Sequence, residues 1–156
     1  MGLLYPEINV DLIIEATHQP IPKLLSNDID IAIVTVKPSS NLLHSVKIFE
    51  DEVFAITHKE NTLSNLDYIS ASDFSEAHLI IHSFPAKTVS VFEHYLKPNN
   101  ISPKKITAIP FTEVALEMVT ANMGLMCMPK WALKSFHLSE DLKFKRIGKF
   151  GLKRSH

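Results

Sequence analysis

Hydrophobic residues along this chain form short continuous runs and longer stretches with helical spacing. Both occur in residues 111–136, FTEVALEMVTANMGLMCMPKWALKSF, which predict a helix, a tight turn, a buried strand and a second helix. In the first part, apolar side chains recur every three to four residues, as on one face of a helix. The run LMCM that follows is typical of a strand that is buried on both faces.

Three residues mark the boundaries of these elements. Thr112 suits the N-cap of the first helix, because its hydroxyl can accept a hydrogen bond from a free backbone N–H. Gly124 lies where a left-handed C-cap is expected, and Pro129 suits the first position of a new helix. A helix start also attracts small carboxylates and phosphates. The alternative is an α/β unit that only packs its own core.

Other apolar runs along the chain predict further strands and helices. The predicted strands are residues 8–14, 29–35, 44–50, 52–58, 79–82, 105–109 and 142–147. Short helical segments are predicted at residues 23–27, 70–76 and 89–96. Strands that alternate with helices predict parallel pairing with right-handed crossovers, so the expected fold class is α/β.

Composition excludes several classes of protein. The chain has 156 residues, 46% hydrophobic and 21% charged, which predicts a globular fold rather than disorder. Its net charge of −1 argues against strong nucleic-acid binding by this chain alone. A single cysteine, Cys127, excludes a disulfide framework and fits a reducing compartment. No apolar run is long enough for a membrane helix.

Few residues are arranged for catalysis or metal binding. His78 and His82 are four residues apart, and the LII between them belongs to a predicted strand, where four residues span about 13 Å, too far for one metal ion. Cys127 lies among methionines and leucines, which would raise its pKa and leave it a packed core residue. His58 and His137 are expected to be solvated. We find no nucleophile elbow or phosphate-binding loop, and therefore predict no catalysis, no metal and no cofactor.

A basic segment, KFKRIGKFGLKR, covers residues 143–154 and holds six cationic side chains. These alternate with apolar residues, a pattern that favours one amphipathic strand with a solvated face. Contact with DNA or a membrane is the less favoured interpretation.

Polar and aromatic side chains recur where predicted strands end, and open α/β sheets bind ligands at the carboxyl ends of their strands. Hydroxyl groups there can hydrogen-bond a small polar ligand, and Phe84, Phe111 and Met128 would contact its apolar parts. Glu113 would weaken anion binding at the helix start. The alternative is that Ser and Thr only cap helices and turns. The predicted ligand-binding residues are Thr17, His18, Thr35, Val36, Ser83, Phe84, Phe111, Thr112 and Met128.

Three segments carry a resemblance to a known family. MVTANMGLMCMPKW resembles the helix–Gly–strand–Pro segment in the effector-binding domain of LysR-type transcriptional regulators. NDIDIAIVT, residues 27–35, resembles the other recurrent segment of that family. Residues 79–105 are most similar to the MetR-type branch, which regulates methionine biosynthesis and senses homocysteine. The resemblance spans residues 5–150.

The resemblance implies two small Rossmann-like subdomains of the periplasmic-binding-protein type II kind. Residues 1–58 and 141–156 would form the first subdomain and residues 59–140 the second. It also implies a domain truncated at both ends. The first strand, most of the next helix and the DNA-binding helix-turn-helix would precede this sequence, and the last strand and helix would be incomplete.

The implied function is effector binding and oligomerisation within a cytoplasmic transcriptional regulator. Its subdomains would close on a small homocysteine-like co-inducer. The implied partners are a second copy of the chain, in a homodimer or tetramer, and DNA through the absent helix-turn-helix, with RNA polymerase as a further candidate and no membrane.

Two alternatives remain open at this point. Residues 89–96 are the best candidate for an interface between copies, unless Phe92 and Leu96 pack inward and leave the rest as ordinary surface. The rival function is a two-lobed solute-binding receptor of a transport system, which shares the architecture.

Overall fold

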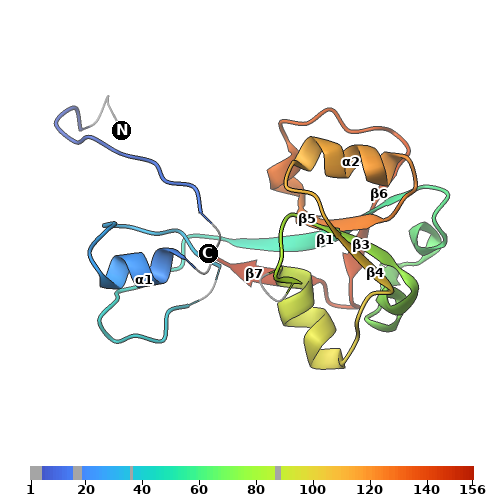
Figure 1. Ribbon diagram of the computed structural model, residues 1–156, viewed down its shortest axis with the longest axis horizontal. Coiled ribbons are helices and arrows are strands. Elements are labelled where there is room, and N and C mark those ends of the chain that lie inside the picture. The colour runs from blue at the N-terminus through green and yellow to red at the C-terminus, as the bar shows by residue number, and fades with distance from the viewer. Residues whose placement is uncertain (1–4, 16–18, 36, 87–88) are drawn as a thin grey trace. The chain divides into compact units, whose positions relative to one another are not determined.

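The computed structural model describes residues 5–15, 19–35, 37–86 and 89–156. The chain divides into two compact units, Met1–Val46 and Lys47–His156 (Figure 1). The first unit contains one helix, α1 (Pro20–Leu25), among its described residues. It begins earlier than predicted, because Pro20 and Pro22 are compatible with the first turn of a helix.

The predicted strands at residues 8–14 and 29–35 are wrong, since the structure assigns no strand to either range. Apolar side chains in both ranges are exposed, including Leu12 at 84%, Ile14 at 90% and Ile31 at 85%. An apolar run indicates what a segment would bury. A strand also needs a neighbour that satisfies its backbone hydrogen bonds, and no described segment of the chain pairs with either range.

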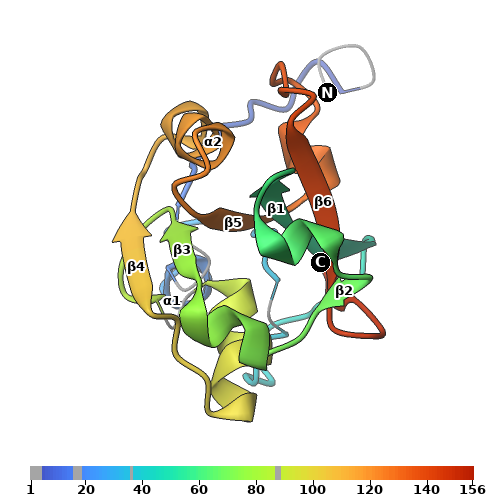
Figure 2. The ribbon, with the colours of Figure 1, turned by 90° about the vertical axis from the view of Figure 1, so that its right-hand side faces the viewer.

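The second unit is built on a mixed sheet whose strands run in the order β2-β6-β1-β5-β3-β4, with β7 also paired to β1 (Figure 2). Predicted strands are confirmed to within about two residues at 52–58, 79–82, 105–109 and 142–147. The strands are β1 (Glu50–His58), β2 (Tyr68–Ile69), β3 (His78–Ile81), β4 (Lys105–Ala108), β5 (Leu125–Pro129), β6 (Leu142–Ile147) and β7 (Leu152–Ser155).

Pairing directions differ across the sheet. β3 is parallel to β4 and β5, as predicted. β1 is antiparallel to β5, β6 and β7, so parallel pairing throughout the sheet is wrong. The predicted strand at residues 44–50 is also wrong, because β1 begins only at Glu50. Since β6 and β7 pair with β1, residues 142–155 belong to the second unit; the proposed division into subdomains stays a prediction.

The basic segment forms two strands rather than one. β6 and β7 follow each other along the same edge of β1, where Phe54 pairs with Arg146 and Val53 pairs with Leu152. The chain turns between them at Gly148 and Gly151, whose φ angles of 70° and 78° lie in the left-handed region.

Short helices connect the strands. The turn predicted at residues 70–76 is confirmed as η2, and the helix predicted at residues 89–96 is observed as η4 running into η5. The second helix predicted after Pro129 is reduced to one 3₁₀ turn, η6. Among the described residues of the second unit, the helices are η1 (Thr62–Asn65), η2 (Ser72–Glu76), η4 (Phe92–Leu96), η5 (Lys97–Asn99), α2 (Thr112–Thr120) and η6 (Lys130–Leu133).

The sheet separates two hydrophobic cores. Leu79 and Ile81 of β3 belong to the core that contains Leu96 of η4, whereas Ile80 between them belongs to the core that contains Leu116 of α2. Figure 2 accordingly shows α2 and the η4–η5 segment on opposite sides of the sheet. Burial on both faces explains why these strands are continuous apolar runs in the sequence.

The η4 segment packs inward, which favours the alternative to an interface. Val91 and Leu96 are fully buried, and Val89, Phe92 and Tyr95 pack against the same core. All the apolar residues that suggested an interface therefore contact the chain's own core.

Gly124 has a different role from the one predicted. α2 ends at Thr120, and the left-handed residue after it is Asn122, with φ 54°. A Cβ at Gly124 would lie 2.7 Å from the backbone oxygen of His78. Glycine is needed because β5 approaches β3 closely at this point.

Candidate functional site

The carboxyl ends of β3, β4 and β5 meet on one edge of the sheet, because these strands are parallel. In register, Ile81 of β3 lies beside Ala108 of β4, and Ile80 lies beside Met126 of β5. The loops that follow carry predicted ligand-binding residues. The structure thus brings to this edge Ser83, Phe84, Phe111, Thr112 and Met128.

A hydrogen bond joins two of these loops. His82 follows the last residue of β3, and its Nε2 lies 3.0 Å from Oγ1 of Thr112. Thr112 is the first residue of α2, and the N-cap is Phe111, which makes no side-chain cap. The predicted N-cap role of Thr112 is therefore wrong, and its hydroxyl faces His82 instead.

His82 is a candidate site residue that the sequence pattern did not select. The predicted strand at residues 79–82 includes His82, whereas β3 ends at Ile81 and leaves His82 in the loop that follows. Burial lowers the pKa of His82, which favours a neutral imidazole. A neutral imidazole both donates and accepts hydrogen bonds without adding charge to the site.

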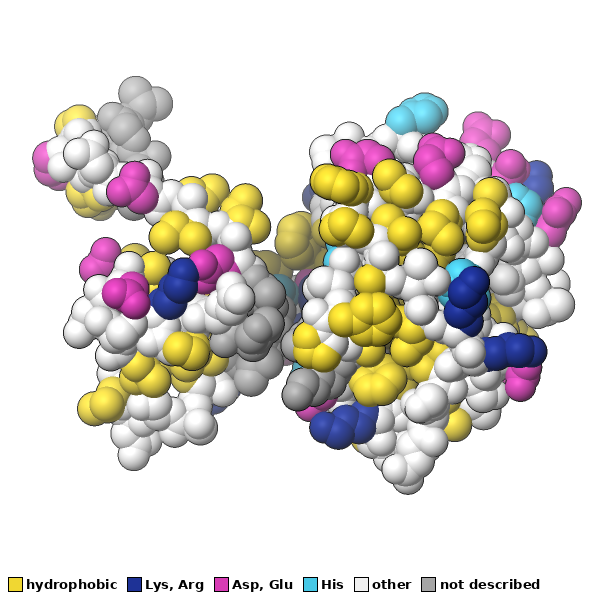
Figure 3. Space-filling view, viewed as in Figure 1, with side chains coloured by type: hydrophobic (Ala, Val, Ile, Leu, Met, Phe, Trp, Pro, Cys, Tyr) yellow, Lys and Arg dark blue, Asp and Glu magenta, His cyan; other side chains and the backbone are white. Residues whose placement is uncertain are grey.

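Aromatic side chains at this edge are exposed to solvent. Phe84 is 61% exposed and Phe111 is 67% exposed, while Met128 is half-buried against the core beneath α2. Figure 3 shows hydrophobic side chains on the surface of the second unit. Hydroxyls beside accessible apolar groups suit a small ligand of mixed polarity.

The other predicted residues belong to the first unit. Thr35 is half-buried, and Thr17, His18 and Val36 lie outside the described residues. That all of them share one site with Ser83 and Thr112 stays a prediction.

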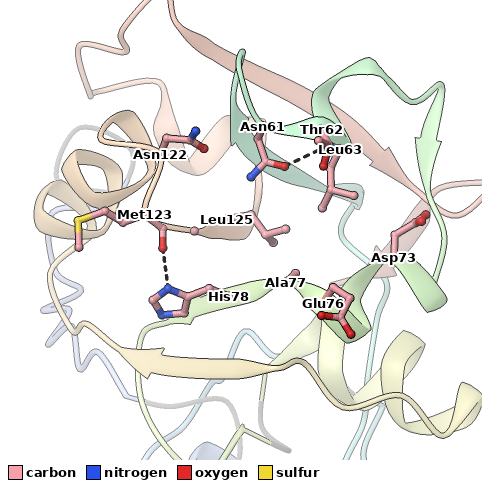
Figure 4. A pocket seen from close by; sticks show the side chains of 11 residues that line it. Asn61, Thr62, Leu63, Asp73, Glu76, Ala77, His78, Asn122, Met123 and Leu125 are labelled. Carbon is pink, nitrogen blue, oxygen red and sulfur yellow. Dashed lines mark hydrogen bonds between the residues drawn. The ribbon is translucent and has the colours of Figure 1, made fainter.

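A polar hollow of about 250 Å³ lies at the opposite edge of the sheet, where β3 and β5 begin (Figure 4). Several of its polar side chains have partners within the chain. Both ring nitrogens of His78 are bonded, at 2.6 Å to the Met123 carbonyl and at 2.7 Å to the Thr107 hydroxyl. Asp73 accepts the backbone N–H of Ser70, and Glu76 pairs with Lys104. The carboxyl edge, where the loops after three parallel strands meet, is the better candidate.

The remaining chemistry-bearing side chains are structural. Burial raises the pKa of Cys127, as predicted. His58 is only 9% exposed, so its predicted solvation is wrong; its Nδ1 accepts the backbone N–H of Glu60. His137 is exposed, as predicted. His78 and His82 lie at opposite ends of β3, and the described residues include no group of three potential metal ligands. No described helix is long and apolar enough to cross a membrane.

Comparison with known proteins identifies the family to which this α/β chain belongs. Residues 3–156 match the LysR substrate binding domain, and the chain belongs to that family. It is 26% identical over 145 residues to the HTH-type transcriptional regulator MetR of Escherichia coli K12, covering 92% of this chain and 45% of MetR. It is 25% identical over 151 residues to CysL of Bacillus subtilis, covering 97% of this chain and 50% of CysL. The chain therefore spans about half the length of these regulators.

A solved structure shows the same fold. The regulatory domain of MetR from N. meningitidis superposes with a TM-score of 0.88 at 21% identity, covering 99% of this chain and 71% of that one. The predicted fold class, α/β of the periplasmic-binding-protein type II kind, and the MetR-like resemblance are both confirmed. The relatives are transcriptional regulators, which does not favour the solute-receptor alternative or an enzyme.

Proposed function

We propose that this MetR-like LysR substrate-binding domain senses a small sulfur amino acid such as homocysteine at the carboxyl edge of β3, β4 and β5. The observation that carries the proposal is the His82–Thr112 hydrogen bond, flanked by the exposed rings of Phe84 and Phe111. The ligand class is the one that the resemblance to the MetR-type branch implies, and curated relatives of this chain are MetR regulators.

The groups at this edge match the chemistry of homocysteine. Its carboxylate would accept hydrogen bonds from Ser83 and Thr112 near the positive end of α2. Its thiol-bearing chain would contact the rings of Phe84 and Phe111, because sulfur packs favourably against aromatic rings. Neutral His82 would hydrogen-bond the ligand without repelling its ammonium group. The proposed set also includes Thr17, His18, Thr35, Val36 and Met128.

The rest of the proposal concerns the intact regulator. Ligand binding would shift the population between two arrangements of its subdomains. The regulator would act in the cytoplasm as a homodimer or tetramer, bind DNA through a separate helix-turn-helix and contact RNA polymerase.

Isothermal titration of the protein with L-homocysteine and L-methionine tests the ligand class. We expect heat of binding with at least one of them. Thr112→Val should weaken binding about tenfold, because it removes a hydrogen bond to a charged group of the ligand; a tenfold change in Kd corresponds to roughly 1.4 kcal/mol of binding free energy. Thr120→Val, at the other end of α2, is the matched control and should bind like the wild type. Absence of heat with any sulfur amino acid, or equal losses in both variants, would contradict the proposal.

A further inference from the structure

A buried ion pair joins the ends of two strands in the second unit. Asp51 of β1 and Arg154 of β7 are cross-strand partners, and their side chains are only 4% and 13% exposed. The guanidinium binds the carboxylate at two points, with Nε 2.8 Å from Oδ1 and Nη2 2.5 Å from Oδ2. This two-point contact fixes both side chains in one geometry.

Two further donors complete the surroundings of this carboxylate. Nε1 of Trp131 donates to Oδ2 of Asp51 at 2.8 Å, and Nε2 of His156 lies 3.1 Å from the same oxygen. Burial by itself would raise the pKa of Asp51. Hydrogen bonds from Arg154, Trp131 and His156, together with the charge of Arg154, outweigh burial and lower that pKa to about 2. The carboxylate is therefore ionised and saturated with donors.

Arg154 also contacts a segment that lies outside the sheet. Its Nη1 donates to Oγ of Ser90, at 3.1 Å, where the helical segment before η4 begins. The ring of His156 stacks on Phe49 at 4.2 Å, and its backbone N–H donates to the Phe49 carbonyl at 2.9 Å. We name five side chains the Asp51 cluster: Asp51, Ser90, Trp131, Arg154 and His156.

We propose that the Asp51 cluster is a conformational relay, which makes the segments around it move together when the proposed effector site is occupied. The relay rests on the proposed function. Trp131 follows the candidate site residue Met128 by three positions, and Asp51 lies four positions after Lys47, where the second unit begins. A shift of the loop after β5 would reach Asp51 through the indole N–H.

The physical reason for concerted movement is the burial of opposite charges. Separating Asp51 from Arg154 would leave an unpaired charge away from water, so intermediate arrangements are unfavourable. Packed elements of this kind switch between discrete arrangements rather than deform gradually. The segments before Asp51 and after Arg154 would respond as one body.

Ser90→Ala tests the relay without any ligand, because it removes only the hydroxyl that Arg154 binds. We expect amide hydrogen exchange to rise about threefold or more at residues 48–51 and 153–156, as well as beside Ser90, because local opening sets exchange rates. The fluorescence of Trp131, the only tryptophan, should shift as well. Ser90→Thr keeps the hydroxyl and should restore both signals. Ser75→Ala removes an exposed hydroxyl that bonds within η2 and should leave both unchanged.

Faster exchange confined to the residues beside Ser90, with Trp131 fluorescence unchanged, would overturn the relay. Titration of the wild type with L-homocysteine is scored separately, by heat of binding. Failure of that titration counts against the proposed ligand and leaves the exchange result to decide the relay.

Discussion

Replacing Arg154 with methionine is expected to lower the free energy of unfolding by about 3–5 kcal/mol. The change removes the partner that binds Asp51 at two points and leaves a carboxylate that is only 4% exposed. The unpaired charge must then be protonated or drawn toward water at the expense of packing. Urea-induced unfolding, followed by circular dichroism, measures the difference.

Arg146→Met is the matched control, because Arg146 also pairs across strands with a carboxylate, that of Glu52, but at the surface. It should change stability by less than about 1 kcal/mol. The double variant Asp51→Asn, Arg154→Met should recover part of the loss, because no buried charge remains. Equal effects of the two arginine variants would contradict the role given to burial in the Asp51 cluster.

Acid should weaken the ion pair between Asp51 and Arg154 over a definite pH range. The pKa of Asp51 in the folded protein is about 2, below the ordinary value of 3.8. A lowered folded pKa contributes stability that is present above the ordinary value and is lost as pH falls toward the folded value. The difference in the free energy of unfolding between the wild type and Arg154→Met should therefore become smaller as the pH falls from about 4 to about 2.

Leu96→Ala should lower the free energy of unfolding by about 2–5 kcal/mol, because the side chain is fully buried and its removal leaves a cavity. His94 lies in the same helix and is exposed, so His94→Ala should change stability by less than about 0.5 kcal/mol. Urea unfolding measures both, and light scattering measures the oligomeric state. A stable Leu96→Ala protein that dissociates into smaller species would show that Leu96 belongs to an interface instead.

The central strands could be predicted because they are buried on both faces. Leu79, Ile80 and Ile81 each contact one of the two cores, so every position of the strand is apolar and the run stands out in the sequence. Pairing could not be predicted in the same way. The antiparallel position of β1 beside β5 depends on contacts far apart in the sequence, which local patterns do not contain.

Residues 8–14 and 29–35 show that an apolar run alone does not predict a strand. They have the composition of buried strands, but hydrogen-bond partners decide whether an extended segment becomes a strand. Gly124 is a similar case: the sequence indicates that glycine is required, and only the nearby His78 carbonyl shows why.

The candidate site was partly accessible to sequence reasoning. The rule that strand ends carry ligand-binding loops selected Thr112 and Ser83. It missed His82, because the predicted strand ends one residue later than β3 does. It assigned the Thr112 hydroxyl to the helix backbone, because the sequence does not show the competing partner on another loop. The Asp51 cluster could not be found, since Asp51 and Arg154 are 103 positions apart.

An amide NMR titration of the protein with L-homocysteine tests the location of the proposed site most directly. We expect progressive shift changes at the carboxyl edge of the sheet, at Ser83, Phe84, Phe111, Thr112 and Met128. Amides of the hollow at the opposite edge, those of Asn61, Glu76 and Asn122, should keep their positions. Shift changes confined to the hollow, or a spectrum unaltered by the ligand, would contradict the proposed site.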